Sequence, residues 1–538
     1  MEINVRDRIG PLALVAILVA GLALLSHMRE APVPVGPITT PVFQPIMSFV
    51  GVSETVAWLG HHVTTHGGDL WLRDVLPNQG GALWLSLVVT LLVGLSHGRA
   101  SGRFVDLLLL QAVGWLLFGT LDLLANERAP EAMSYMRLAF TGASLVTTVL
   151  WVRTFLWQQP SVAPPWQPAL PRHVLKAGAI ALAVMNLTIV FIELPDDSSF
   201  FANLGAQRMR ETGRLPYGDP LLTNTAGAAY GPVMYGVHAL VQQAVAAPVP
   251  APIDPAAPRA IADDPRPPDV VPRLVLACAH LTTLVLLFLL GRQLMDETAA
   301  WGLLVLYTSA PWLVDMASTR ASVAGLTYVS HIVPPAASLA AFAALDWPVM
   351  SGMLLAVAAG LGFYPAFFFP VWVGAQWGRS QSAALWFTAG FGAVCSLILA
   401  WVLLASQAAP GLSLVGTIVR DTLGHHSDPA GYGRSLFGLW GQQTGVMAWL
   451  ARPLAGTSTM ASPFFLLYVV SLLLATHLAR RADRPRVALL TAGAAIGANL
   501  WKIHATVSYV AWYAPFLLLG VLALGTRSSS DSPEAQTV

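Results

Sequence analysis

Residues 193–235 read ELPDDSSFFANLGAQRMRETGRLPYGDPLLTNTAGAAYGPVMY and directly follow an uncharged apolar run at residues 177–192. The Pro-Asp-Asp near the start predicts that a new short helix begins there, with Asp197 or Ser198 as its N-cap. Gly213 is a natural stop for that helix, and Gly/Pro turns follow it. An acidic pair, a short helix, a basic cluster and two aromatic turns therefore lie beside the end of an apolar segment. This combination is more than a connecting loop requires and indicates a functional site.

The composition is typical of a membrane protein. The chain has 538 residues, of which 55% are hydrophobic and 11% charged, and its mean hydropathy is +0.62. A soluble domain carries about 25% charged residues. The net charge of +1 gives no reason to expect nucleic acid as a partner. Cys278 and Cys395 both fall in apolar runs, which predicts buried structural thiols rather than a disulfide framework.

Apolar segments that could cross a bilayer recur along the chain. We predict an all-α, polytopic membrane protein with about fourteen transmembrane helices, because a span needs about 20 mostly apolar residues, or fewer where protein shields it. Their expected positions are 9–27, 80–97, 104–125, 134–157, 174–194, 270–291, 298–315, 331–345, 348–361, 364–378, 382–406, 463–479, 487–503 and 506–525. Residues 346–348 and 362–365 are either tight turns between short helices or kinks in longer ones.

Basic residues in the short connections predict the orientation. Counted over these spans, thirteen of them fall on one side, which is expected to be cytoplasmic. They are Arg6, Arg8, Arg99, Arg103, Arg172, Lys176, Arg292, Arg379, Arg480, Arg481, Arg484, Arg486 and Arg527. Both termini are then cytoplasmic, and the long segments 28–79, 195–269 and 407–462 lie on the other side. We expect a bacterial inner membrane, with these segments facing the periplasm.

The predicted spans fall into two groups. Residues 1–158 form an N-terminal four-helix membrane region, and residues 159–173 are a Pro-rich cytoplasmic linker. Residues 174–525 form a ten-helix membrane core that contains the acidic stretch. Residues 526–538 are polar and predict a disordered cytoplasmic tail.

Asp196 and Asp197 are the candidate catalytic residues. A carboxylate at this position could act as a general base on an acceptor hydroxyl. The plainer alternative is a helix N-cap, where the helix dipole favours negative charge. Two adjacent acids alone are weak grounds for a divalent metal site, so we predict no metal and no cofactor.

Other polar residues on the predicted outer side are candidates for substrate binding. Arginine can hold phosphate by paired hydrogen bonds, but a solvated helix face or contact with lipid headgroups is also open. Tyrosines at an interface are ordinary, and a histidine that opens a span can simply cap it. The candidates are Arg208, Arg210, Arg214, Tyr217, Asp219, Tyr230, Arg320, His331, Arg420, Arg434, Lys502 and His504.

Several common catalytic patterns are absent from the sequence. It contains no P-loop, no HExxH and no GxSxG motif. The charged residues fall mostly at the outer ends of spans, whereas a transporter usually places ionisable groups near the middle of the membrane.

The stretch resembles a known family of membrane enzymes. An apolar span, then Pro195-Asp196-Asp197, an amphipathic helix, ETGRLPYGDP at 211–220 and AAYGPVMY at 228–235 is similar to the polytopic GT-C glycosyltransferases, in particular the bacterial enzymes that use polyprenyl-phosphate sugars. The resemblance covers about residues 174–525 and is specific only at 193–235. It implies a GT-C-like core with short amphipathic helices in the first large outer loop. The four spans of residues 1–158 depart from the family pattern.

The resemblance also implies a reaction. Asp196 or Asp197 would be the base, and a sugar would move from a polyprenyl-phosphate donor to a glycan, lipid or protein acceptor, with inversion. Five of the candidates match no family motif and are proposed only from their charge and their predicted place on the outer side of the membrane: Arg320, Arg420, Arg434, Lys502 and His504. The alternatives are a transporter or flippase of lipid-linked sugars and a non-catalytic membrane scaffold.

Overall fold

The computed structural model of the protein describes residues 80–94, 102–125, 143, 145–158, 166–192, 195, 197–220, 222, 226–245, 270–313, 325–406, 416–417, 463–501 and 509–524. The secondary structure of these residues is helical, and none of them forms a strand. One isolated β-bridge joins Leu215 and Ser406. The predicted all-α fold class is therefore confirmed for this part of the chain.

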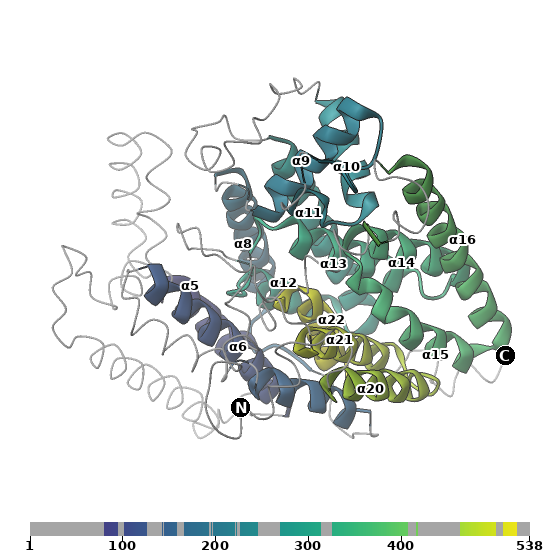
Figure 1. Cartoon of the computed structure of the whole chain (residues 1–538). Helices are drawn as coiled ribbons and strands as arrows, with labels where there is room; N and C mark the ends of the chain where they lie inside the picture. The colour runs from purple at the N-terminus through teal and green to yellow at the C-terminus, as the bar shows by residue number, and fades with distance from the viewer. Residues whose placement is uncertain are drawn as a thin grey trace, which may run out of the picture.

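Helices lie where the apolar runs predicted them (Figure 1). They are α5 (Gly80–Gly94), α6 (Gly102–Ala125), an unlabelled helix Leu145–Leu156, α8 (Arg172–Ile192), α9 (Asp197–Thr212), η1 (Ala226–Ala228), α10 (Pro232–Ala244), α11 (Val270–Leu294), α12 (Glu297–Thr308), α13 (Val329–Ala343), α14 (Pro348–Gly362), η3 (Tyr364–Phe368), α15 (Phe369–Arg379), α16 (Gln381–Ala405), α20 (Pro463–Ala479), α21 (Arg484–Trp501) and α22 (Val510–Ala523). A helix overlaps each predicted span except 9–27, which lies outside the described residues.

Three of these helices, α8, α11 and α16, are long and apolar enough to cross a membrane. Five shorter apolar helices accompany them: Leu145–Leu156, Val329–Ala343, Pro348–Gly362, Leu466–Ala479 and Val510–Ala523. The described helices thus support a membrane protein. The expected number of fourteen crossings stays a prediction.

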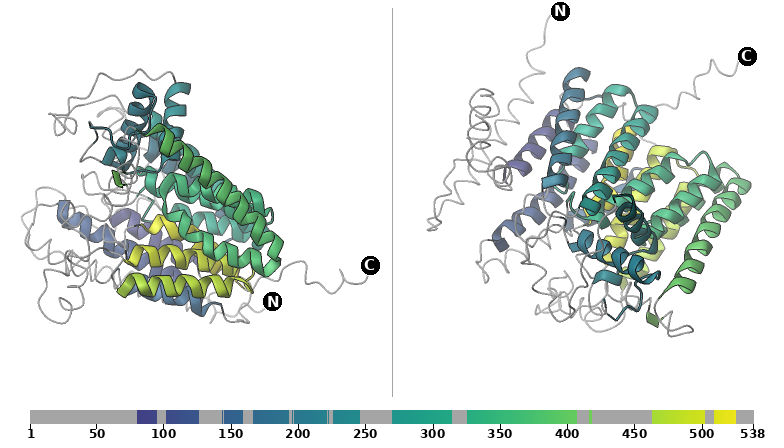
Figure 2. Two further views of the ribbon diagram at one scale, coloured as in Figure 1. Left: turned by 45° about the vertical axis from the view of Figure 1, so that its right-hand side comes forward. Right: turned by 90° about the horizontal axis from the view of Figure 1, so that it is seen from above.

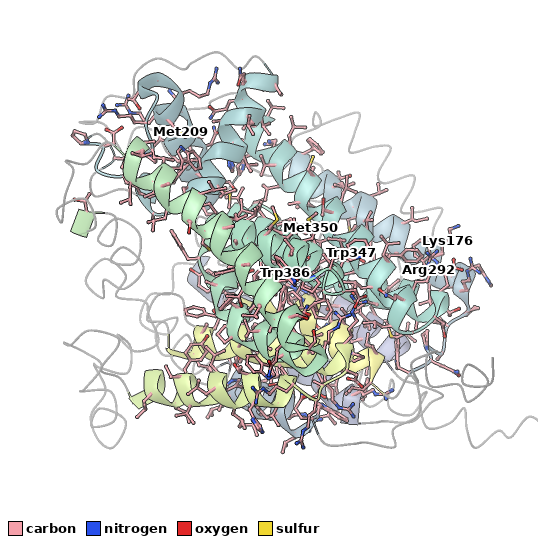
Figure 3. The ribbon with its side chains drawn as sticks, turned by 90° about the vertical axis from the view of Figure 1, so that its right-hand side faces the viewer. Lys176, Met209, Arg292, Trp347, Met350 and Trp386 are labelled. Carbon is pink, nitrogen blue, oxygen red and sulfur yellow. The ribbon has the colours of Figure 1, made fainter. Side chains whose placement is uncertain are left out.

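The outer surface of α16 is apolar and exposed. Leu397 and Leu404 are 69% and 87% exposed. Figure 3 shows Trp347, Met350 and Trp386 near one another over α14 and α16. A continuous apolar face of this kind is unfavourable in water and suits contact with lipid chains. Cys278 of α11 is also exposed, so the prediction that both thiols are buried is wrong for that residue.

Helix ends that carry basic residues gather at one end of the bundle, here called the arginine-rich end. Asp346, in the turn between α13 and α14, pairs with Arg379 at 2.9 Å and with Arg484 at 3.1 Å. The Arg486 guanidinium donates to the backbone carbonyl of Trp157 at 3.4 Å. The ends of α13, α15 and helix Leu145–Leu156 therefore meet the starts of α14 and α21.

The amphipathic helices α9 and α10 lie at the opposite end. From the arginine-rich end, α16 starts next to Arg379 and runs to Ala405, whose carbonyl accepts a hydrogen bond from Leu215 N at 2.7 Å. Figure 3 shows Lys176 and Arg292 at one end of α8 and α11, with Met209 of α9 at the other. Figure 1 and the left view of Figure 2 also show α9 and α10 at one end of the bundle, away from α20 and α21.

Helix length separates the outer helices from the inner ones. Helices α11 and α16 have 25 residues each, which corresponds to about 38 Å at 1.5 Å per residue. Helices α12, α13, α14 and α22 have 12, 15, 15 and 14 residues, or about 18–23 Å. Each of these four has one terminus at the arginine-rich end, so they stop part-way to α9 and α10.

The described helices of the predicted N-terminal region pack on the core. Helix α5 contacts α12, and α6 contacts α22. Asp106 of α6 is 2% exposed, forms an ion pair with Arg153 and accepts a hydrogen bond from Trp157 Nε1 at 2.7 Å. The Arg103 guanidinium donates to the carbonyl of Leu524 at the end of α22. The Asp106 contacts hold helices of this region together, and the Arg103 hydrogen bond attaches the region to the core.

The breaks expected at residues 346–348 and 362–365 are turns between short helices rather than kinks in longer ones. Residues 344–347 form the turn between α13 and α14, which pack against each other. Helix α14 ends at Gly362, and Phe363 has φ 56°, a left-handed conformation that is costly for a residue with a side chain. The chain then forms η3 and returns as α15 to the arginine-rich end.

Close packing of α14 on α16 gives a test of the fold. A Cβ atom on Gly352 would lie 2.1 Å from the Phe387 carbonyl oxygen, and one on Gly390 would lie 2.4 Å from that of Val349. Small residues allow such close approach of helices in membranes. We expect Gly352→Ala to lower the free energy of unfolding by about 1–3 kcal/mol, measured by thermal unfolding in detergent.

The matched control is Gly392→Ala, also on α16, where an added Cβ meets nothing within 4 Å. Because alanine favours helix over glycine by up to about 1 kcal/mol, this control should be neutral or stabilising. Equal effects of the two substitutions would contradict the close contact.

Candidate functional site

Helix α9 begins one residue earlier than its sequence signals suggest. Asp197 is its first helical residue, so the prediction of Asp197 or Ser198 as N-cap is wrong. The expected stop at Gly213 is confirmed, with φ 69° there. Asp196 and the side chain of Asp197 lie outside the described part of the structure, so the choice of base stays a prediction.

The first turn of α9 is fastened to the start of α13 through Ser199. Its hydroxyl donates to the Thr327 carbonyl and accepts from Val329 N at 3.1 Å, and its side chain is fully buried. The neighbouring Ser198 hydroxyl is also buried and has no hydrogen-bond partner among the described residues. The start of α9 therefore lies directly against the segment that leads into α13.

Four aromatic side chains meet beside this contact and form what we call the rim aromatic cluster: Tyr328, His331, Tyr509 and Trp512. The His331 ring lies 4.9 Å from that of Tyr328 and 4.8 Å from that of Tyr509, measured between ring centres. Tyr509 and Trp512 are 4.1 Å apart, and Trp512 Nε1 donates to the Ser330 carbonyl at 3.1 Å. The cluster joins the starts of α13 and α22.

His331 does not cap α13 in the structure. The N-cap residue is Tyr328, which makes no side-chain capping bond, and His331 is the third residue of the helix. Its ring is 3% exposed and packs in the rim aromatic cluster instead. The structure thus brings this predicted residue close to the start of α9 through a tertiary contact.

The two aromatic turns after α9 form a hydrogen-bonded loop. Tyr217 Oη donates to the Tyr230 carbonyl at 2.7 Å. Tyr235 Oη donates to the Gly227 carbonyl at 2.9 Å and accepts from Tyr230 N at 3.0 Å. Gly231 lies directly on α14, because a Cβ there would be 2.0 Å from the Gly360 carbonyl oxygen. Tyr217 and Tyr230 therefore shape the loop and anchor it to the bundle.

Arg208 and Asp219 form an ion pair within the same unit. Arg208 Nε donates to Asp219 Oδ2 at 2.8 Å, and Asp219 is 1% exposed. Glu211 pairs with the same guanidinium. The hydrogen bond to Asp219 raises the pKa of Arg208 above its usual value. Arg208 is thus held by carboxylates of its own unit.

Arg208 and Arg210 of α9, and Arg214 just after it, lie at the far end of that helix from its start. Arg208 and Arg210 follow Asp197 by 11 and 13 residues on one helix, which is about 17–20 Å along its axis. Arg210 donates to Gln242 at 3.5 Å, and Arg210 and Arg214 are exposed. A base at the start of α9 and a phosphate at its far end would be too far apart for one reaction centre.

The remaining predicted residues lie outside the described part of the chain. They are Arg320, Arg420, Arg434, Lys502 and His504. Described residues that flank two of these segments lie at the site. Thr327 accepts a hydrogen bond from Ser199, and Tyr509 belongs to the rim aromatic cluster.

No sequence signal singles out Ser199, Tyr509 and Trp512 as site residues. Ser199 follows the acidic pair, but a serine near a helix start usually indicates capping. Tyr509 and Trp512 lie three residues apart at the start of an apolar span, where aromatic residues are common at the membrane interface. Only the tertiary contact with α13 distinguishes them.

Among the described residues, no group of three or more His, Cys, Asp or Glu side chains is placed to hold a metal ion. The described side chains at the site offer hydroxyl groups, an imidazole and aromatic faces beside the start of α9. Such groups suit hydrogen bonding to, and stacking on, a polar organic ligand.

The chain matches no protein-family model, no curated protein and no solved structure in the three comparisons made.

The hydrogen bonds of the aromatic loop give a second test. Tyr217→Phe and Asp219→Asn should each weaken the loop by about 1–2 kcal/mol, because a buried bond or ion-pair partner is lost. We expect backbone hydrogen exchange of residues 214–220 and 226–230 to become roughly tenfold faster, as 1.4 kcal/mol is tenfold in an opening equilibrium.

Arg214→Ala is the control, since that side chain is exposed at the same loop. It should leave exchange in both segments unchanged. Faster exchange in the control, or unchanged exchange in both loop variants, would contradict the role given to these bonds.

Proposed function

We propose that the protein is an integral membrane glycosyltransferase with a GT-C-type core. It transfers a sugar from a polyprenyl-phosphate donor to a glycan, lipid or protein acceptor. The reaction takes place at the α9 end of the bundle, which faces the periplasmic side of a bacterial inner membrane. The resemblance of residues 193–235 to that superfamily and the architecture around α9 support this proposal.

One observation carries it: the start of α9 is held by Ser199 against the start of α13, beside the rim aromatic cluster. This contact lies at the start of α13, which is the end of that helix away from the arginine-rich end. A lipid-linked donor cannot leave the bilayer, so an enzyme that uses it must hold its reactive groups at such a rim.

The reaction needs one base and a stabilised leaving group. The carboxylate of Asp196 or Asp197 takes the proton of the acceptor hydroxyl. The acceptor oxygen bonds to the anomeric carbon on the face opposite the phosphate, while the bond from that carbon to the phosphate oxygen breaks. The electron pair stays with the polyprenyl phosphate, and the anomeric configuration is inverted.

Cationic groups must stabilise the negative charge that develops on the phosphate. The arginines of α9 are about 17–20 Å along the helix from Asp197. We therefore assign this role to residues proposed from charge and side, namely Arg320, Arg420, Arg434, Lys502 and His504. Arg210 and Arg214 would instead contact lipid headgroups or a distant part of the acceptor.

The decisive experiment compares Asp196→Asn and Asp197→Asn with the parent protein in an assay with a panel of polyprenyl-phosphate sugars. Asparagine keeps the shape of aspartate but cannot take the proton. We expect the variant at the base to lose transfer by about 10²–10⁴-fold, while the other variant loses far less. Transfer is measured as radiolabelled sugar that appears in the acceptor fraction.

Asp483→Asn is the matched control, because Asp483 is a half-exposed carboxylate at the arginine-rich end and pairs only locally with Arg486 at 2.7 Å. It should retain parental transfer. Normal transfer in both loop variants would refute the mechanism. Movement of the intact labelled donor across a liposome, without any transfer of its sugar, would favour the flippase.

A further inference from the structure

A second group of polar side chains lies within the bundle, and the proposed reaction does not use it. We call it the inner polar cluster: Asn186, His280, Thr283, Tyr307 and Tyr364. His280 is fully buried, and neither of its ring nitrogens has a hydrogen-bond partner among the described residues. The Tyr364 hydroxyl and Asn186 Oδ1 are also buried and lack partners there.

These side chains come from four elements and lie close together around the end of α12. The His280 ring stacks on Tyr307, with ring centres 6.3 Å apart, and the Tyr307 hydroxyl is hydrogen-bonded to Thr283. Tyr364 lies near Tyr307. Asn186 Nδ2 donates to the Thr308 carbonyl at 3.1 Å, next to Tyr307.

The members of the cluster lie at a common depth. Fourteen residues separate His280 from the end of α11 at Leu294, and fourteen separate Asn186 from the start of α8 at Arg172. Both distances correspond to about 21 Å from the arginine-rich end. Tyr364 lies two residues after the end of the 15-residue α14, at about 23 Å. The starts of α13 and α22, which carry the rim aromatic cluster, lie at a similar distance from the arginine-rich end, so the two clusters share one level of the bundle.

Unpaired polar groups at this depth are unfavourable. Each buried donor or acceptor without a partner costs about 1–3 kcal/mol, and such groups normally bind water or a ligand. The unpaired groups are an imidazole, a phenol and an amide, which are matched to neutral hydroxyl groups as donors and acceptors. The left-handed backbone at Phe363, just before Tyr364, is a further local cost that the fold retains.

The inner polar cluster is continuous with the candidate site. The Tyr364 ring stacks on Trp512 with ring centres 3.8 Å apart and planes 6° apart. Trp512 belongs to the rim aromatic cluster, which touches the segment held by Ser199. A row of aromatic rings thus leads from the start of α9 to Tyr364, which lies near Tyr307.

We propose that the inner polar cluster is a binding site for hydroxyl groups, which water fills at rest and the sugar of the donor enters. Stacked rings offer flat faces to a sugar ring, and the unpaired groups offer partners to its hydroxyls. This inference deepens the proposed function and its sugar part rests on it, whereas the hydration of the cluster does not.

Radiolytic hydroxyl footprinting of the full-length protein in nanodiscs tests the proposal. Radicals form from water, so a buried tyrosine is modified quickly only when water lies beside it. Tyr307 and Tyr364 should be modified well above Tyr235, a fully buried tyrosine whose hydroxyl both donates and accepts hydrogen bonds. Modification of all three at the same low level would overturn the proposal.

The source of the hydroxyl groups is tested by addition of two lipids. A polyprenyl-phosphate hexose that the protein uses should suppress modification of Tyr307 and Tyr364, and polyprenyl phosphate without sugar should not. Sugar transfer without suppression would overturn the sugar assignment alone. Failure of transfer with every donor would instead overturn the proposed function, even if the cluster is hydrated.

A variant separates binding from mere packing. His280→Phe removes both unpaired nitrogens but keeps a flat ring, so modification of Tyr307 should fall to the level of Tyr235 while the melting temperature stays equal or rises. KM for the donor should rise in this variant. His477→Phe, an exposed histidine at the arginine-rich end, should change neither. If Tyr307 is modified in His280→Phe as in the parent, and KM for the donor is also unchanged, the proposed site is refuted.

Discussion

Hydrocarbon offers no hydrogen-bond partner to the end of a helix, and this constraint shapes the whole bundle. The short inner helices stop part-way through it, so neighbouring side chains pair with the backbone at their ends. Asn186 donates to the Thr308 carbonyl at the end of α12. Ser199 accepts from Val329 N at the start of α13, and Asn499 donates to the Tyr509 carbonyl just before α22.

Arginines serve the same purpose for other helix ends. Arg273 of α11 donates to the Phe191 carbonyl near the end of α8, and Arg103 to that of Leu524 after α22. Arg484 donates to the Ala343 carbonyl at the end of α13 at 3.2 Å. The side chains that complete these ends also fix which helices are neighbours, so hydrogen bonding and helix order are set together.

The sequence predicted the helices well because apolar runs and turn residues are local signals. Gly213 ends α9, and the turn after α13 falls at the predicted break. Relations between distant segments were not predictable in this way. Nothing near His331 in sequence shows that Tyr509 will stack on it, and Ser199 looks like a capping residue until Val329 is seen to bond to it.

Sequence proximity was also misleading inside the acidic stretch. Asp197 and Arg210 look like members of one centre, yet a single helix holds them about 20 Å apart. The inner polar cluster shows the opposite case, in which residues from Asn186 to Tyr364 converge. Helix propensity does not predict such tertiary contacts, because they depend on which helices are shorter than the bundle.

The backbone contact of Gly352 and Gly390 has a mechanical meaning. Two helices whose main chains touch have no side chains between them to give way, so α16 and α14 move together. Tyr364 follows α14 after one residue, Phe363. Pressure from the surrounding lipid on α16 is therefore transmitted through α14 to residues at the centre of the bundle.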